Sequence, residues 1–96
     1  MSEWTIISKY GLVLTHLWKN PSSTAREIAS VIKTTEWTVH RIIAELEAAE
    51  YIERRKEGRN NVYRVNPGIG LRHDTTRHVL LGDLLQVLGR QDANTG

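Results

Sequence analysis

Within residues 34–50, apolar side chains recur every three or four positions, which predicts an amphipathic helix with one buried face. The apolar positions are Val39, Ile42, Ile43 and Leu46. At about 100° per residue, Trp37 and Arg41 point to the opposite side of this helix. Thr38 and His40 flank them. The exposed face therefore combines polar, basic and aromatic side chains.

Two β-like runs follow the helix, Tyr51–Lys56 and Asn61–Val65, and the second alternates apolar and polar residues. The turn between them holds Glu57, Gly58, Arg59 and Asn60. The two runs predict a β-hairpin that is rich in arginine. A polar-faced helix followed by such a hairpin can read base edges in a DNA groove and hold the flanking backbone.

A second, shorter helix is predicted upstream, after the loop Asn-Pro-Ser-Ser of residues 20–23. Thr24 and Glu27 have the spacing of a capping box, which starts a helix. The apolar residues of this helix are Ile28, Ala29 and Ile32. Thr35 is the expected N-cap of the following helix. Two short helices joined by a tight turn form a helix-turn-helix, whose second helix enters the major groove of DNA.

These motifs occur together in the run PSSTAREIASVIKTTEWTVHRIIAELEAAEYIERRKEGRNNVYRVNP. This run resembles the winged helix-turn-helix of small prokaryotic transcriptional regulators in the MarR/ArsR-like group, and the resemblance extends over roughly residues 8–88. It implies a cytoplasmic regulator that binds double-stranded DNA sequence-specifically as a homodimer. The recognition helix would lie in the major groove, and the basic wing on the backbone or in the minor groove.

The resemblance has one departure, at the end of the recognition helix. Glu50 stands where the family usually has glycine, just before Tyr51 and Ile52. That position is often left-handed, which costs a residue other than glycine roughly 1 kcal/mol. We therefore expect the helix either to run on or to end differently.

Apolar stripes on the first and last helices predict a dimer scaffold. The first helix carries Ile6, Tyr10, Val13, Leu14 and Leu17 on the face expected to meet the core. The last helix is expected to begin near Asp74, a good N-cap. The apolar side chains of this helix, with Val87 included, form a stripe that covers about 160° of the helix surface. Packing against one small domain requires a narrower stripe. A second copy would cover the surplus, and the predicted interface is Leu12, Leu80, Leu81, Leu84, Leu85 and Leu88.

The predicted fold is mainly α with a small β-hairpin (α+β), a winged helix-turn-helix with flanking N- and C-terminal dimerisation helices. Residues 1–90 form a single domain. Within it, the helix-turn-helix occupies about 24–50, the wing about 51–65 and the C-terminal dimerisation helix about 74–89. Residues 91–96 are expected to form a flexible tail.

The distribution of charge matters more than the net charge of +2. Residues 51–65 hold five cationic residues against two acidic ones, whereas residues 24–50 hold three against five. The wing is therefore the electrostatic anchor, and the recognition helix carries few charges for phosphate. We expect moderate, salt-sensitive DNA affinity that needs two copies of the chain.

Composition argues against several other classes of protein. The chain has no cysteine, and it lacks a signal core or an apolar run near the ~20 residues of a membrane span. No paired carboxylates, glycine-rich phosphate loop or cofactor fingerprint occurs, so neither an enzyme nor a bound cofactor is expected. The pattern assigns no effector ligand.

His73, Asp74 and His78 are candidate metal ligands, since the last two lie one helical turn apart. No third ligand follows a turn later, and Arg72 and Arg77 beside these residues oppose a cation. The sequence therefore predicts no metal.

Two functions from different classes remain, a DNA-binding regulator and a winged-helix protein-interaction module without specific DNA binding. The candidate DNA-binding residues are Thr24, Thr35, Trp37, Thr38, His40, Arg41, Arg54, Lys56, Arg59 and Asn60. Several have a second interpretation. The arginines of the hairpin strands can be solvated partners of Glu53 and Glu57, and His40 can be an ordinary surface residue. Trp37 can touch a sugar or a thymine methyl, or it can pack against the wing.

Overall fold

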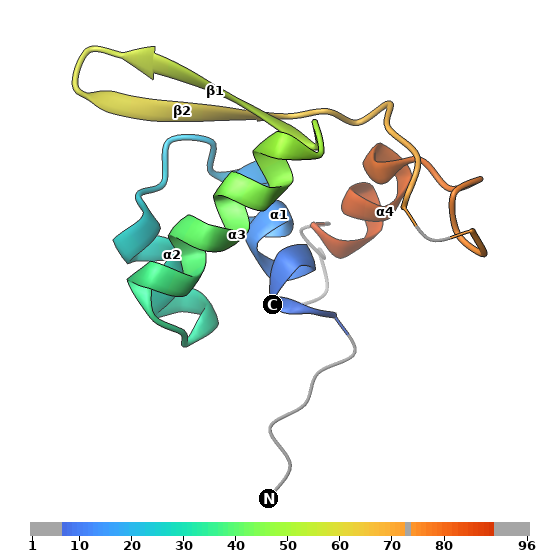
Figure 1. Ribbon diagram of the computed structural model, residues 1–96, viewed down its shortest axis with the longest axis horizontal. Coiled ribbons are helices and arrows are strands. Elements are labelled where there is room, and N and C mark those ends of the chain that lie inside the picture. Colours follow the sequence, from blue (N-terminus) through green and yellow to red (C-terminus); the bar gives the residue numbers. More distant parts are fainter. Residues whose placement is uncertain (1–6, 73, 90–96) are drawn as a thin grey trace, which may run out of the picture.

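The computed structural model describes residues 7–72 and 74–89 as four helices and a two-stranded antiparallel hairpin (Figure 1). The elements are α1 (Lys9–Lys19), α2 (Ala25–Ile32), α3 (Glu36–Ala48), β1 (Ile52–Glu57), β2 (Asn60–Val65) and α4 (Leu81–Leu88). The hairpin follows α3 directly and forms the wing. This confirms the predicted winged helix-turn-helix, mainly α with a small β-hairpin. The proposed tail and Ile6 lie outside the described residues.

One apolar core holds the helices and the base of the wing together. The apolar face predicted for α3 is buried as expected, with no side chain more than 4% exposed. It meets apolar residues from each of the other elements, namely Val13, Leu14, Leu17, Ile28, Ala29, Ile52, Tyr63, Val65, Leu81 and Leu85. Burial of these side chains fixes the position of α3 beneath the wing.

Side-chain caps define the two helices of the helix-turn-helix. Thr24 accepts from the Glu27 amide at 3.1 Å, and the Glu27 carboxylate accepts from the Thr24 amide at 2.8 Å. Both halves of the predicted capping box are therefore present. The turn passes through Lys33, whose φ of 61° is left-handed. Thr35 then caps α3 by accepting from the Thr38 amide at 3.1 Å, as predicted.

The recognition helix ends at Ala48 in the turn that glycine usually makes, so both expectations for Glu50, that the helix would run on or end differently, are wrong. Glu50 takes the left-handed conformation itself, with a φ of 67°. Its amide donates to the carbonyl of Glu47 at 3.0 Å, and the Tyr51 amide donates to that of Leu46 at 2.9 Å. These two bonds satisfy carbonyls that the helix end leaves free. The chain thus makes the turn that usually uses glycine.

The first strand of the wing lies one residue later than expected, and the second strand begins one residue earlier than expected, at Asn60. Its register runs from Ile52 opposite Val65 to Glu57 opposite Asn60, so only Gly58 and Arg59 remain as the turn. Gly58 has a φ of 63°, which glycine adopts without steric cost. The short turn leaves Arg59 at the tip.

The last helix begins at Leu81, later than the prediction at Asp74, and Leu80 is its N-cap. The cause is backbone pairing that the sequence pattern does not reveal. Gly70 forms a bridge with Leu80, and the Leu81 amide donates to the carbonyl of Ile69 at 2.7 Å. Backbone groups used in this way cannot join a helix, so the residues before Leu80 form turns. The shortened α4 packs against α1, on the side of Figure 1 away from the wing tip.

Candidate nucleic-acid interface

A groove runs between the start of α2, the first turns of α3 and the wing. Four of the predicted DNA-binding residues line it, although they lie far apart in the sequence: Thr24, His40, Arg59 and Asn60. The remaining lining residues are Ser22, Ser23, Ala25, Arg26, Glu36, Asn61 and Tyr63. The structure therefore unites one residue of the positioning helix, one of the recognition helix and the wing tip.

Arg26 and Glu36 belong to this groove and were not among the predicted site residues. Each occupies the first turn of its helix, next to a capping threonine. The signal was available in the sequence, because residues that follow an N-cap by one or two positions lie near the end of the helix that faces DNA.

The exposed basic side chains of α3 and of the wing strands mostly lie close to glutamates of the same chain. On α3, His40 lies 3.9 Å from Glu36. On the outer face of the hairpin, Arg55 pairs with Glu57 at 2.6 Å and Arg64 pairs with Glu53 at 3.9 Å. The solvated, paired interpretation is therefore right for these two strand arginines.

Arg54 has a different partner. It lies 3.7 Å from Glu47 of α3, so it ties the base of the wing to the recognition helix. Among residues 7–72 and 74–89, Arg26, Lys56 and Arg59 have no acidic side chain within ion-pair distance. These three cations can meet a phosphate without first giving up a partner.

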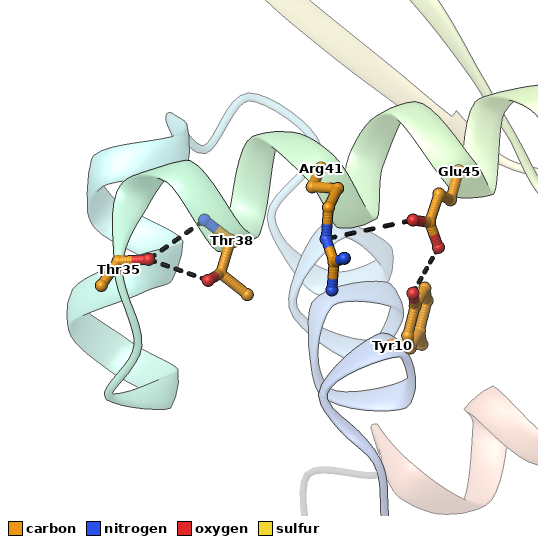
Figure 2. A network of polar contacts seen from close by, with 5 residues as sticks. All are labelled: Tyr10, Thr35, Thr38, Arg41 and Glu45. Atoms are coloured by element: carbon orange, nitrogen blue, oxygen red, sulfur yellow. Dashed lines mark hydrogen bonds and ion pairs between the residues drawn. The ribbon is translucent and has the colours of Figure 1, made fainter.

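The outward face of α3 carries Trp37 and Arg41, as the helical spacing predicted. The Trp37 side chain is 70% exposed, so it does not pack against the wing. The Arg41 guanidinium carbon lies 5.5 Å from the centroid of the Trp37 ring, within the range of a cation–π contact. Thr35 and Thr38, also predicted as site residues, share a hydroxyl–hydroxyl bond of 2.8 Å (Figure 2).

A contact with α1 was not foreseen. Tyr10 was expected to face the core, but it is 36% exposed, and its hydroxyl donates to the Oε1 atom of Glu45 on α3 (Figure 2). Glu45 uses its other oxygen, Oε2, to approach the Nε atom of Arg41 at 4.0 Å. The hydrogen bond to the Glu45 carboxylate raises the pKa of Tyr10 above its usual value. One carboxylate thus joins the first helix to the recognition helix.

Residues 7–72 and 74–89 contain no group of three metal-ligating side chains, and His73 lies outside them. None of the helices found there has the length and apolarity needed to cross a bilayer.

Comparison with known proteins agrees with this geometry. The MarR family model matches residues 11–61, which is more than half of the chain and runs from α1 to the start of β2. Among curated proteins, no sequence matches this chain. Proteins of the MarR family are DNA-binding transcriptional regulators and not enzymes. From the winged helix-turn-helix, the groove beneath its wing and this family match, we conclude that the chain belongs to the MarR family.

Proposed function

We propose that the chain binds a palindromic duplex sequence-specifically as a homodimer, with α3 in the major groove and the wing on the backbone or in the minor groove. One observation carries this proposal. Thr24, His40, Arg59 and Asn60 come from three separate elements and line one groove. Residues that approach DNA from a positioning helix, a recognition helix and a wing must converge in this way.

The basic side chains of the wing, of α2 and of α3 suggest different roles in DNA binding. Lys56 and Arg59 on the wing, with Arg26 at the start of α2, are free of acidic partners in the described chain and would contact phosphates. Trp37 and Arg41 on α3 would meet base edges. Arg54 is occupied by Glu47, so its predicted DNA contact would be weaker than that of the wing tip.

The three threonines predicted to contact DNA also stabilise the fold. Thr24 and Thr35 cap α2 and α3, and Thr38 bonds to Thr35. A contact between these hydroxyls and DNA would come in addition to their capping role. Their loss would therefore weaken both the fold and the binding.

The proposed dimer uses the part of the apolar stripe that the single chain leaves uncovered. Leu81 and Leu85 are each 1% exposed, so these two predicted interface residues belong to the chain's own core. Leu80 and Val87 are 44% and 60% exposed. Leu84 and Leu88 of α4 and Leu12 of α1 are partly exposed. An exposed apolar strip of this kind favours pairing with a second copy.

A protein-interaction function remains the second candidate, because one observation favours it. Trp37 is exposed on α3, which also carries the acidic residues Glu36 and Glu45, and an exposed aromatic side chain can anchor a protein partner. DNA would be repelled by this acidity, whereas a basic protein surface would be attracted.

Selection of a duplex from a random-sequence pool, followed by gel shifts at low and physiological salt, distinguishes the two candidates. The regulator proposal predicts an enriched palindrome that binds more tightly than a scrambled duplex of the same length. Its half-sites should be one helical turn, about 34 Å, apart. A chain that enriches no sequence and shifts neither duplex at either salt concentration would favour the protein-interaction function.

A further inference from the structure

Arg41 is held on two sides by other residues of the chain. The Trp37 ring lies against its guanidinium group, and the Glu45 carboxylate approaches its Nε atom. Glu45 is itself held, because its second oxygen accepts from the hydroxyl of Tyr10. Figure 2 shows this chain of contacts running from α1 through Glu45 to Arg41.

The atom that Glu45 engages determines what Arg41 has left to offer. A contact at Nε leaves the two terminal nitrogens, Nη1 and Nη2, outside the ion pair. These are two of the donors that an arginine can direct at a planar acceptor. Guanine presents two such acceptors, O6 and N7, in the major groove. The arrangement therefore orients Arg41 without blocking the edge that reads a base.

We propose, on the basis of the DNA-binding function proposed above, that Tyr10 is a positioning residue for base recognition, acting through Glu45 to hold Arg41 ready to contact a guanine. Tyr10 itself touches no base. It restrains the Glu45 carboxylate, the carboxylate restrains the guanidinium, and Trp37 limits its rotation from the other side. The preference of the recognition helix then depends on a residue of α1.

Restraint of this kind matters because an exposed ion pair alone is weak. The Arg41 and Glu45 side chains are both about half exposed, and such pairs contribute about 0–1 kcal/mol. A free arginine also loses rotamer freedom when it binds a base. A carboxylate fixed by a hydroxyl from a second helix removes part of that freedom before DNA arrives. Its loss should therefore reduce discrimination between sequences more than it reduces binding to any DNA.

The test compares Tyr10→Phe, Arg41→Ala and the double variant on two duplexes, one enriched by the wild-type chain from a random pool and one scrambled. Tyr10→Phe removes only the hydroxyl. We expect it to lower the ratio of the two affinities about 3-fold, and Arg41→Ala to lower it about 10-fold or more. The double variant should match Arg41→Ala, because Tyr10 acts only through Arg41.

Tyr51→Phe is the matched control. It removes the same atom from a tyrosine whose hydroxyl donates to the Gly70 carbonyl at 3.4 Å and not to a residue of the recognition helix. This variant should keep the wild-type ratio. Replacing each guanine of the enriched duplex by 7-deazaguanine removes N7 alone. At one position this replacement should weaken DNA binding by the wild type, weaken binding by Tyr10→Phe less and leave binding by Arg41→Ala unchanged. A merely structural role for Tyr10 would not produce this pattern.

Several outcomes would overturn the inference. Tyr10→Phe could keep the wild-type ratio, or its loss could add fully to that of Arg41→Ala. If Tyr10→Phe lost affinity equally for both duplexes, Tyr10 would have only a general role in the fold. A wild-type chain that enriches no duplex would instead refute sequence-specific binding, and the inference with it. The failure of the proposed function is thus visible before any variant is made.

Discussion

At the scale of single residues, the difference between paired and unpaired cations organises the surface of this protein. Arg55 and Arg59 lie close together on the wing, yet Arg55 is bound to Glu57 at 2.6 Å and Arg59 projects from the tip. A phosphate must displace the carboxylate to reach Arg55, whereas nothing in the described chain competes for Arg59. Formal charge alone does not make this distinction.

Arg59→Ala should therefore weaken binding to specific and scrambled DNA by similar factors. It should also flatten the plot of log affinity against log salt concentration by about one unit of slope, the loss of one phosphate contact. Arg55→Ala is the control with the same change and a smaller expected effect. Fluorescence anisotropy over a range of salt concentrations measures both, and an unchanged slope for Arg59→Ala would remove it from the interface.

Glu50 carries a conformational cost that can be measured. Its φ of 67° suits glycine, so Glu50→Gly should raise the free energy of unfolding by about 1 kcal/mol. Glu53→Gly, at an exposed position near the start of β1, should lower it by about 0.5–1 kcal/mol, because glycine loses more freedom there. Urea denaturation gives both values. A lower urea midpoint for Glu50→Gly would contradict the account of the helix end.

At the scale of elements, the sequence predicted correctly those features that depend on residues close together in the chain. The capping box at Thr24, the cap at Thr35 and the buried face of α3 depend on neighbouring residues, and all are present. The start of α4 depends on pairing between distant backbone groups near Gly70 and Leu80, which no local pattern encodes. The same holds at the site, where four of the groove residues were predicted individually, but the link from Tyr10 to α3 required the fold.

The packing of α4 gives a prediction for Gly82. A Cβ added there would lie 2.7 Å from the Cβ of Pro67 and 3.0 Å from its carbonyl oxygen. Gly82→Ala should thus destabilise the chain by about 1–3 kcal/mol, as overpacking does. Gly68→Ala is the control, because its nearest neighbour would be Asn66 Oδ1 at 3.7 Å. Thermal unfolding of both variants compares them, and equal melting temperatures would show that α4 is not held by this contact.

At the scale of the whole molecule, the apolar residues divide into those that the single chain uses and those that it leaves exposed. Leu81 and Leu85 close the core from α4, while Leu80 and Val87 face outward from the same helix. The net charge of residues 24–50 is negative and therefore unfavourable for DNA, so one copy of the chain offers few phosphate contacts. Two copies on a palindrome would double the number of phosphate contacts. The outward apolar residues would then support DNA binding by holding the two copies together.

Replacing Leu80 and Val87 by glutamate should separate the dimer and leave the protomer folded, because both side chains are already largely exposed. Light scattering at micromolar concentration should give twice the 11.0 kDa chain mass for the wild type and the chain mass for the variant. Circular dichroism checks that the variant remains helical. A wild-type monomer that still binds its duplex would refute the dimer.

The central claim is that this winged helix reads DNA with the outward face of α3 and with the groove shared by α2, α3 and the wing. Its most direct test is an anisotropy titration of the wild-type chain with the palindrome it enriches and with a scrambled duplex, at several salt concentrations. The account predicts tighter binding to the palindrome at every concentration, and affinity for both duplexes that falls as salt rises. Equal affinity for the two duplexes, or binding that does not respond to salt, would contradict it.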